Sequence, residues 1–273
     1  MKKELDQYTI VNLRNVLLEI LDEFVRICGE NKLIYFLHAG TLLGAVRHNG
    51  FIPWDDDIDV AMPRKDYEKF LDVYNKLGKT DYYVLSDRNT NNNHHEPFAK
   101  LCKKGTVFAE SAKDEYTGIY IDIFPFDNCV LSFTFIQTIL IKFVLLLCKY
   151  KFHKYIPKKK NKKLFFILFI KPLCFFLSQR FLYTLHKKLY LMFNTFNTKY
   201  ISSFTGFYGY KRETHKYNTI FPLSSICFEG KKYCAPCNYD LFLKNMYGNY
   251  MELPPVEKQI NHNPKYIIFN DVS

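Results

Sequence analysis

Four aspartates stand close together in the stretch "WDDDIDVAM", and two of them, Asp57 and Asp59, are separated by one residue. In a strand, residues two apart point to the same side, so Asp57 and Asp59 share one face and Ile58 and Val60 share the other. Neighbouring carboxylates repel each other, and a divalent cation relieves that repulsion. Mg²⁺ is typically held by one or two carboxylates together with substrate phosphates. The pair therefore predicts a site for Mg²⁺ or Mn²⁺.

A third carboxylate has similar surroundings. Asp122 in "YIDIF" is flanked by isoleucines, which is typical of a buried strand with one carboxylate on its other face. Three carboxylates on adjacent strands suit phosphoryl transfer with one or two metal ions. We therefore expect Asp57, Asp59 and Asp122 to be catalytic and to bind the metal. Asp56 is interpreted as a loop acid that is solvated or hydrogen-bonds the turn.

The residues before the aspartates fit anion binding. Gly40 and Thr41 follow an apolar run and open a short helix, where backbone N–H groups could cradle a phosphate and Gly44 would allow close approach. Arg47 and His48 follow one or two turns later, where they could meet a second phosphate charge. An anion-binding turn is thus predicted beside the cation-binding pair.

Two further candidates have two interpretations each. Trp54, the only tryptophan, could stack on a base or could fasten its loop. Lys100, in the strand-like segment "FAKLCKK", could contact a phosphate or could be a lysine at the edge of a strand. The sequence leaves both questions open.

The elements that must position these residues follow from the apolar pattern. Helical spacing predicts an amphipathic helix over residues 9–28, and residues 33–40 read as a buried strand that ends in a turn. A short helix over 41–48, a strand over 57–62 and a helix over 64–78 come next. Four strand-like segments then follow, "YYVLS", "FAKLCKK", "TVFAE" and "GIYIDIFPF". Strands mixed with helices in this order predict an α+β (α/β mixed) sheet domain.

The composition changes at residue 128. Residues 128–212 contain sixteen Lys and Arg and no Asp or Glu, which leaves 22 basic and 27 acidic residues for the rest of this chain of 273 residues and net charge +11. We therefore expect a catalytic core over 1–127, a largely helical, basic and hydrophobic insert over 128–212, and a segment over 213–273 that packs back on the core.

The insert has three possible interpretations. A membrane-spanning helix needs about twenty predominantly apolar residues. Lys142 interrupts the first apolar block, and Lys171 with Pro172 interrupts the second. An interfacial or re-entrant helical hairpin and ordinary core helices are the alternatives to spanning. Because anionic lipid attracts Lys and Arg, the basic excess favours an anionic membrane surface as a partner.

The cysteines and the N-terminus indicate the compartment. Eight cysteines are scattered without a regular framework, which indicates reduced thiols. The first twenty residues lack the uninterrupted apolar segment of a signal peptide. We expect a cytoplasmic protein, peripheral at the inner face of the cytoplasmic membrane.

Three blocks of the sequence resemble the LicD family of phosphocholine and polyol-phosphate transferases, which includes the fukutin-related proteins. They are "GTLLGAVRHNGFIPWDDDIDVAMPRKDYEKF", "GIYIDIFPFD" and "FEGKKYCAPCNYDLFLKNMYGNYMELPPVEKQINH". The first block is long and specific, and together the blocks span most of the chain, with the insert as the part that carries no resemblance.

The resemblance implies a nucleotidyltransferase-like mixed sheet flanked by helices, in which Asp57, Asp59 and Asp122 correspond to the metal-binding carboxylates. In the last block, Tyr247 and His262 match the family pattern "YG-x-Y…PP…H" and become candidates for substrate binding. The two prolines before His262 stiffen the chain and could direct the histidine back to the site.

The function implied is a Mg²⁺-dependent transfer of phosphocholine or polyol phosphate from a CDP-alcohol, such as CDP-choline or CDP-ribitol, with release of CMP. The acceptor implied is a hydroxyl of a cell-surface glycan, such as lipopolysaccharide or teichoic acid, or of its lipid-linked precursor. One alternative is a template-independent nucleotidyltransferase acting on RNA or a small molecule. Because the lysines of the insert alternate with apolar blocks too long for base stacking, we expect no nucleic acid partner. The other alternative, an inactive membrane-associated scaffold, would predict loss of one of the three acids, and all three are present.

Overall fold

The computed structural model describes residues 6–77, 80–86, 96–109, 117–153, 177–206, 208–262 and 264–269. The chain forms two compact units. Unit 1 comprises Met1–Phe126, Thr205–Phe207 and His215–Ser273, and unit 2 comprises Asp127–Phe204 and Tyr208–Thr214. The structure therefore assigns the acidic motif to unit 1 and nearly all of the basic insert to unit 2.

Helix α1 (Gln7–Glu30) confirms the helix predicted over residues 9–28. Asp6 caps its N-terminus, because the Asp6 carboxylate accepts a hydrogen bond of 2.9 Å from the backbone N–H of Thr9. One face of the helix is buried with the period of an α-helix, and its buried residues are Leu13, Leu17, Ile20, Leu21, Phe24, Ile27 and Cys28. This apolar face contributes to the core of unit 1.

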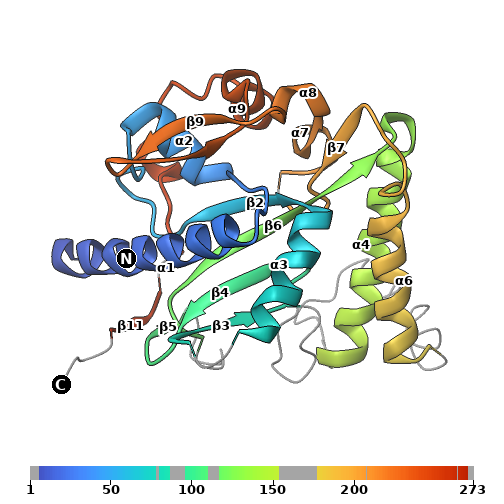
Figure 1. Ribbon diagram of the computed structural model, residues 1–273, viewed down its shortest axis with the longest axis horizontal. Coiled ribbons are helices and arrows are strands. Elements are labelled where there is room, and N and C mark those ends of the chain that lie inside the picture. Colours follow the sequence, from blue (N-terminus) through green and yellow to red (C-terminus); the bar gives the residue numbers. More distant parts are fainter. Residues whose placement is uncertain are drawn as a thin grey trace. The chain divides into compact units, whose positions relative to one another are not determined.

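The central sheet of unit 1 is mixed, as Figure 1 shows, and confirms the predicted α+β class. Its strand order is β1-β2-β6-β4-β3, in which β2 and β6 run parallel and the other pairs are antiparallel. The strands are β1 (Phe36–Leu37), β2 (Asp59–Pro63), β3 (Tyr82–Leu85), β4 (Ala99–Lys103) and β6 (Tyr120–Cys129). The middle strand β6 is buried along nearly its whole length, so a polar side chain on it must find a partner inside the protein.

The remaining elements of unit 1 surround this sheet. Helices α2 (Ala39–His48) and α3 (Arg64–Lys76) flank β2 in the sequence, and a hairpin of β9 (Ser224–Phe228) and β10 (Lys231–Ala235) leads to α9 (Tyr239–Tyr247). The short elements are β5 (Val107–Ala109), β8 (Thr214–Lys216), α8 (Tyr217–Ile220), the 3₁₀ turn η2 (Val256–Lys258) and β11 (Tyr266–Ile268). Strand β11 pairs with β5, so the end of the chain returns to the sheet domain.

The strand expected over residues 33–40 is too long in that prediction. Only Phe36 and Leu37 form a ladder, with Ala61 and Val60 of β2 as partners. The strand ends there because the chain turns at Ala39, which has a φ of 40° and begins α2. The helix predicted over 41–48 thus begins two residues earlier, and Gly40 lies with Thr41 in its first turn.

Unit 2 consists chiefly of α4 (Leu131–His153) and α6 (Gln179–Leu191), with β7 (Tyr200–Ser202) and α7 (Tyr210–Glu213). Strand β7 pairs with the last three residues of β6. The two long helices share an apolar core of Cys129, Ile141, Val144, Leu147, Leu182, Leu189, Tyr190 and Phe204. Among the described residues, no helix combines the length and the apolar character that crossing a bilayer demands. Lys171 and Pro172, which we expected to break the second block, lie outside the described residues.

Glu213 of α7 makes the stability of the protein depend on pH. Its side chain is 1% exposed, and its Oε1 accepts a hydrogen bond of 3.1 Å from the backbone N–H of Tyr208. Burial raises the pKa of Glu213 from 4.5 to about 7. Between these values the folded protein holds a proton that the unfolded chain releases, so stability decreases as pH rises through this window.

We expect Glu213→Gln to flatten this part of the pH–stability profile, because glutamine keeps the acceptor oxygen and has no charge to bury. At pH 8 the variant should unfold at a higher temperature than the wild type, while at pH 4 the two should agree. One pKa unit corresponds to about 1.4 kcal/mol, which sets the scale of the difference. Thermal melts across the pH range measure it, with the exposed Glu257→Gln as the control. Parallel profiles for wild type and Glu213→Gln would contradict the prediction.

Candidate functional site

Arg14 of α1 holds the loop that carries the acids. Its Nη2 donates hydrogen bonds to the carbonyl oxygens of Ile52 (2.8 Å), Pro53 (2.9 Å) and Asp55 (3.0 Å). These carbonyls therefore find their partner in one guanidinium rather than in a strand. Sequence reasoning missed Arg14, because nothing in the pattern of an amphipathic helix distinguishes one arginine on its polar side.

The loop also explains why Asp57 is not part of a strand. Strand β2 begins at Asp59, so the prediction that Asp57 and Asp59 share one strand face is wrong for Asp57. The physical reason is the lack of a ladder partner, because β1 pairs only with Val60 and Ala61, and Arg14 takes the loop carbonyls upstream. Asp57 still lies near the other acids, but its position depends on the loop.

Asp59 and Asp122 are neighbours across the two parallel strands. They are Cα partners in the register of β2 with β6. The backbone N–H of Asp59 donates to Thr41 Oγ1 (2.8 Å), and that of Asp122 donates to the carbonyl of Ile58 (2.9 Å). Both side chains are buried, with 8% and 7% exposure. The sheet therefore brings two carboxylates, 63 positions apart in the chain, to one place.

The carboxylates influence one another electrostatically. Burial, and then the charges of Asp57, Asp122 and Asp55, raise the pKa of Asp59 well above its ordinary value. Burial also raises the pKa of Asp57, although His262 lowers it in part. For Asp122, burial raises the pKa to about 7 against the lowering effect of Lys100. The predicted residues Asp57, Asp59 and Asp122 thus lie in one cluster.

Gly40 makes room for another member of this cluster. A Cβ at Gly40 would lie 2.8 Å from Asp55 Oδ2, so the absence of a side chain lets Asp55 approach the first turn of α2. Burial, followed by the charge of Asp57, raises the pKa of Asp55 well above its ordinary value. The loop acid next to the predicted pair therefore belongs to the cluster as well.

Lys100 is a central residue and not a lysine at a strand edge. It lies on β4, between β6 and β3, and its Cα partner on β6 is Asp122. Its Nζ lies 3.3 Å from Asp122 Oδ1, 3.0 Å from Glu96 Oε2 and 3.6 Å from the centroid of the Tyr120 ring. Burial alone would lower the pKa of Lys100, but Asp122 and Glu96 raise it above its ordinary value. Lys100 supplies the positive charge of the cluster.

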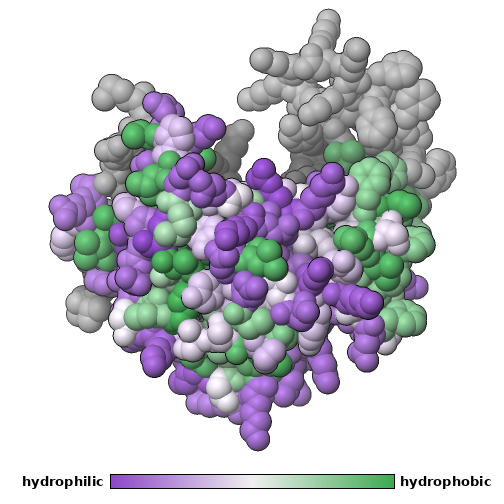
Figure 2. Space-filling model, turned by 90° about the horizontal axis from the view of Figure 1, so that it is seen from above, coloured by the Kyte–Doolittle hydropathy of each residue, from purple (hydrophilic) through white to green (hydrophobic). Residues whose placement is uncertain are grey.

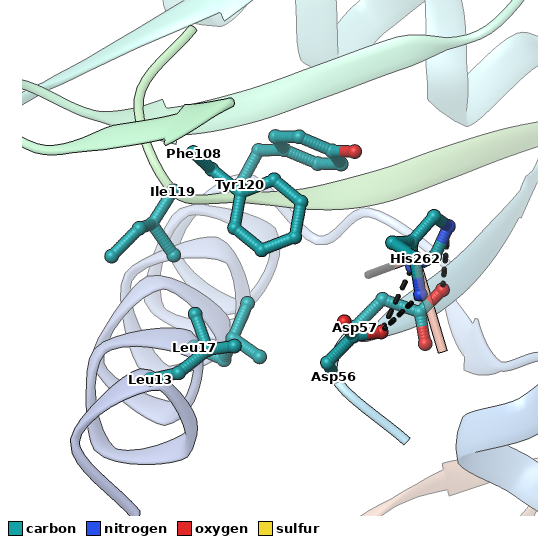
Figure 3. A pocket seen from close by; sticks show the side chains of 8 residues that line it. All are labelled: Leu13, Leu17, Asp56, Asp57, Phe108, Ile119, Tyr120 and His262. Atoms are coloured by element: carbon teal, nitrogen blue, oxygen red, sulfur yellow. Dashed lines mark hydrogen bonds and ion pairs between the residues drawn. The ribbon is translucent and has the colours of Figure 1, made fainter. Parts of the chain in front are cut away.

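His262 returns to the acidic loop from near the C-terminus, as its preceding prolines suggested. Its Nδ1 lies 2.9 Å from Asp56 Oδ1, and its backbone N–H donates to the same oxygen at 3.2 Å. Its Nε2 lies 3.8 Å from Asp57 Oδ2. Figure 3 shows the imidazole beside both carboxylates, with Leu13 and Leu17 of α1 among the apolar residues near them.

The interpretation of Asp56 as a solvated or turn-bonding acid is wrong. Its side chain is fully buried and its hydrogen-bond partner, His262, is 206 positions away in the chain. The other oxygen, Oδ2, is buried without a hydrogen-bond partner among the residues that the structure describes. The one sequence signal for this role is the run of three aspartates at 55–57, and that run does not indicate which aspartate points into the protein.

Other predicted substrate-binding residues make contacts that the sequence did not suggest. The Nη1 of Arg47 donates to the carbonyls of Tyr250 (2.7 Å) and Glu252 (3.4 Å), so Arg47 tethers the C-terminal segment. A Cβ at Gly44 would lie 2.4 Å from the Gly50 carbonyl, so the chain itself fills the space that we expected a phosphate to approach.

Three predicted substrate-binding residues remain to be placed. His48 follows Arg47 at the end of α2, Trp54 is half-buried in the acidic loop, and Tyr247 ends α9. Burial, and then the charge of Arg47, lower the pKa of His48. Contact of any of these residues with a substrate remains a prediction.

The cluster fits a hard divalent cation. Its donors are carboxylate oxygens, which are the ligands that Mg²⁺ and Mn²⁺ prefer. Burial first, and then the charges of neighbouring carboxylates, raise the pKa values of Asp55, Asp59 and Asp122. One ligand atom each from Asp56, Asp57 and His262 lie within 4.8 Å of one another, and the orphaned Asp56 Oδ2 adds a donor. This group shares only Asp57 with the predicted set, so metal binding by Asp57, Asp59 and Asp122 together remains a prediction.

Comparison with known proteins identifies the relatives of this chain. The model of the LicD family, described as "LicD/FKTN/FKRP, nucleotidyltransferase domain", matches residues 32–172. The lipopolysaccharide cholinephosphotransferase LicD of Haemophilus influenzae is 30% identical over 254 residues, which are 91% of this chain and 93% of that protein. An uncharacterized protein of Rickettsia prowazekii is 36% identical over 115 residues, 40% of each chain. An uncharacterized protein of Rickettsia typhi is 29% identical over 111 residues, which are 41% of this chain and 34% of that protein.

We expect Lys100→Met to destabilise the protein by about 3 kcal/mol at pH 8, because it leaves the buried carboxylate of Asp122 without its cation. The double variant Lys100→Met with Asp122→Asn should recover much of this loss, since the uncompensated charge is then removed. Urea unfolding of the two variants and of Asp122→Asn measures the coupling.

The exposed pair of Lys244 and Asp240 provides the control. Lys244→Met breaks a contact of 2.8 Å between side chains that are 60% and 50% exposed, and should cost less than about 1 kcal/mol. If the double variant Lys100→Met with Asp122→Asn is no more stable than Lys100→Met alone, the loss of stability does not arise from the unpaired charge of Asp122.

Proposed function

The chain belongs to the LicD family, and on that premise we propose that it transfers phosphocholine or a polyol phosphate from a CDP-alcohol to a hydroxyl of a cell-surface glycan. A lipid-linked glycan precursor is an equivalent acceptor. The observation that carries the proposal is the register of β2 with β6, which sets Asp59 beside Asp122 and within the influence of Asp57. The similarity to a cholinephosphotransferase over nearly the whole of both chains supports phosphocholine as the transferred group.

The residues of the cluster divide into metal ligands and positioning groups. Asp57, Asp59 and Asp122 are the proposed ligands of Mg²⁺ or Mn²⁺. The bound ion would neutralise the phosphate charges of the donor and stabilise the charge that develops on the leaving CMP. Lys100 positions Asp122 through the contact of 3.3 Å, and Arg14 positions the loop of Asp57.

The acceptor hydroxyl needs a base. In the proposed reaction its oxygen forms a bond to the phosphorus that carries the alcohol, the bond from that phosphorus to the oxygen of CMP breaks, and the hydroxyl proton passes to the protein. Asp122 is a proposed metal ligand and is engaged by Lys100 at 3.3 Å, so another group must take the proton. His262 is better placed, because Asp56 lies against its Nδ1 at 2.9 Å and leaves Nε2 as the proton acceptor. Asp56 then acts as the group that orients the imidazole.

The donor requires contacts of its own. The first turn of α2, with Gly40 and Thr41, is the proposed site for a donor phosphate, because a helix N-terminus favours negative charge. Thr41 also fixes Asp59 through the hydrogen bond of 2.8 Å, so the same turn positions a proposed metal ligand. This places the proposed anion site next to the proposed cation site.

A template-independent nucleotidyltransferase remains the second candidate, because the matching family model describes a nucleotidyltransferase domain. The two reactions differ in their products. Transfer from a CDP-alcohol releases CMP, whereas addition of a nucleotide from a triphosphate releases pyrophosphate. Incubation with CDP-choline, CDP-ribitol, ATP or CTP, each with lipopolysaccharide or RNA, therefore separates them.

We expect CMP release from a CDP-alcohol in the presence of lipopolysaccharide and Mg²⁺, with loss of turnover on chelation and recovery with Mg²⁺ or Mn²⁺. Asp59→Asn and Asp122→Asn should each lower kcat/KM by about 10²- to 10³-fold, the scale for removal of one electrostatic group from an active site. Asp81→Asn, which changes an exposed aspartate outside the cluster, is the control and should keep full activity. Pyrophosphate release with RNA would favour the second candidate, and full turnover by both cluster variants would contradict the metal assignment.

A separate prediction concerns the pair of His262 and Asp56. His262→Gln should lower kcat more than it changes KM, because the base acts in the transition state. Asp56→Asn should have a similar effect, and the double variant should be no worse than His262→Gln, since the two residues act as a unit. Steady-state kinetics of the three variants test this. Multiplicative effects of the two substitutions would show that they act independently.

A further inference from the structure

Helix α4 turns apolar side chains to the outside over its first three and a half turns. Seven large hydrophobic residues on it are each between 36% and 54% exposed. They are Leu131, Phe133, Phe135, Ile136, Ile139, Leu140 and Phe143, and we call them the α4 outer face. Single exposed hydrophobic residues are ordinary, but a contiguous patch on one helix marks a surface that something covers.

The inner face of the first two turns is polar, whereas Ile141 in the third turn belongs to the apolar core shared with α6. Thr134, Gln137 and Thr138 are 0%, 2% and 7% exposed. Gln137 Nε2 donates to the carbonyl of Leu189 on α6 at 2.7 Å, while the hydroxyls of Thr134 and Thr138 donate to the carbonyls of Val130, just before α4, and of Thr134. A helix in water shows the reverse pattern, with polar groups outward and apolar groups inward. This part of α4 therefore has the polarity expected when the medium beyond it is apolar.

The charge of the residues around α4 indicates which apolar medium covers this face. Residues 128–212 contain no acid, and the acids at either end of this range, Asp127 and Glu213, are 0% and 1% exposed. Lys142 on α4, Lys188 on α6 and Lys199 are exposed. A second copy would bring the same excess of positive charge against this one, whereas an anionic lipid surface matches both the apolar and the basic character.

We propose that the α4 outer face inserts into the interfacial layer of an anionic bilayer, with α4 lying along the surface and the basic side chains of unit 2 on the headgroups. Lying along the surface agrees with the lack of a bilayer-crossing helix among the described residues. Insertion of apolar side chains and attraction of Lys and Arg are two weak signals, which together give reversible attachment. The proposal does not rest on the proposed reaction, because binding to lipid needs no turnover.

The neighbouring surface is continuous with this face. A groove of about 670 Å³ begins at the N-terminal end of α4, and its lining includes Leu131, Phe193, Phe196 and Lys199. Phe196 is 61% exposed and Met192, at the end of α6, is 43% exposed. In Figure 2, green and pale green predominate at the right-hand side of the molecule, where α4 and α6 lie in Figure 1. The apolar surface therefore extends from α4 to the chain that follows α6.

Flotation of the full-length protein with vesicles tests the proposal. We expect binding to vesicles of phosphatidylglycerol in phosphatidylcholine, and about tenfold weaker partitioning for the double variant Ile136→Ser with Leu140→Ser. The matched control is Val11→Ser with Leu241→Ser, which removes two equally exposed apolar residues from unit 1 and should bind as the wild type does. Unchanged thermal melts establish that both variants fold.

A second set of variants tests how much the lysines contribute to binding. Lys188→Gln with Lys199→Gln should weaken binding to the anionic vesicles severalfold, and Lys65→Gln with Lys244→Gln, in unit 1, should not. In pure phosphatidylcholine, the first of these pairs should have no effect. Equal loss for both lysine pairs would show that only total charge matters and would contradict docking through unit 2.

A third experiment detects contact between the α4 outer face and lipid directly, through an added fluorophore. Ile139→Trp places a fluorophore on the α4 outer face, and phosphatidylglycerol vesicles with brominated acyl chains should quench its emission beyond that of Trp54 in the wild type. No additional quenching, or wild-type flotation by the Ile136 and Leu140 variant, overturns the proposal. Sedimentation that shows a dimer abolished by the same variant would assign the face to a second copy instead.

Discussion

Repulsion among buried carboxylates constrains most of the structure around the acidic loop. Asp59 and Asp122 are neighbours in a sheet with little access to water, so each raises the free energy of the other's charged form. The chain answers with Lys100 from β4, which lies against Asp122, and with His262, which lies against Asp56 and lowers the pKa of Asp57. These two residues come from distant parts of the chain. The return of the C-terminal segment to the sheet is therefore part of the electrostatics of the site and not merely a matter of packing.

The part of this arrangement that could be predicted from sequence is local. The apolar spacing of α1 and the isoleucines around Asp122 each reflect burial of one side of one element, so the elements and their inward faces follow from neighbouring residues. The inward turn of Asp56 could not follow, because its partner His262 is 206 positions away and makes no periodic pattern. Likewise, Lys100 becomes central only through the order β6-β4-β3, which no single segment contains.

Unit 2 also has one feature that could be predicted from the sequence and one that could not. Its composition separates residues 128–212 from the acidic remainder of the chain, because charge and hydrophobicity are summed properties, and residues 127–204 and 208–214 form a compact unit. The direction in which each face of a helix points is not a summed property, so the composition does not predict it. Thr134, Gln137 and Thr138 are the residues that a sequence pattern assigns to water, yet they are buried, and Gln137 donates to the Leu189 carbonyl of α6. Hydrogen bonding thus overrides the amphipathic rule in the first two turns of α4, while Ile141, Val144 and Leu147 further along point inward as the rule expects.

Segregation of charge along the chain also limits what can bind where. A nucleoside diphosphate carries negative charge, and so does the cluster of Asp55, Asp57, Asp59 and Asp122 that is proposed to receive it. Without a cation the two would repel, and the single ammonium of Lys100 is already shared between Asp122 and Glu96. The positive charge needed for a phosphate donor must therefore come from outside the cluster. The sixteen basic residues of 128–212 are not required for that purpose if a divalent ion supplies it, which leaves them to act on a second anionic surface. Under the two proposals, one chain would separate a site that needs an added cation from a surface that already carries its own positive charge.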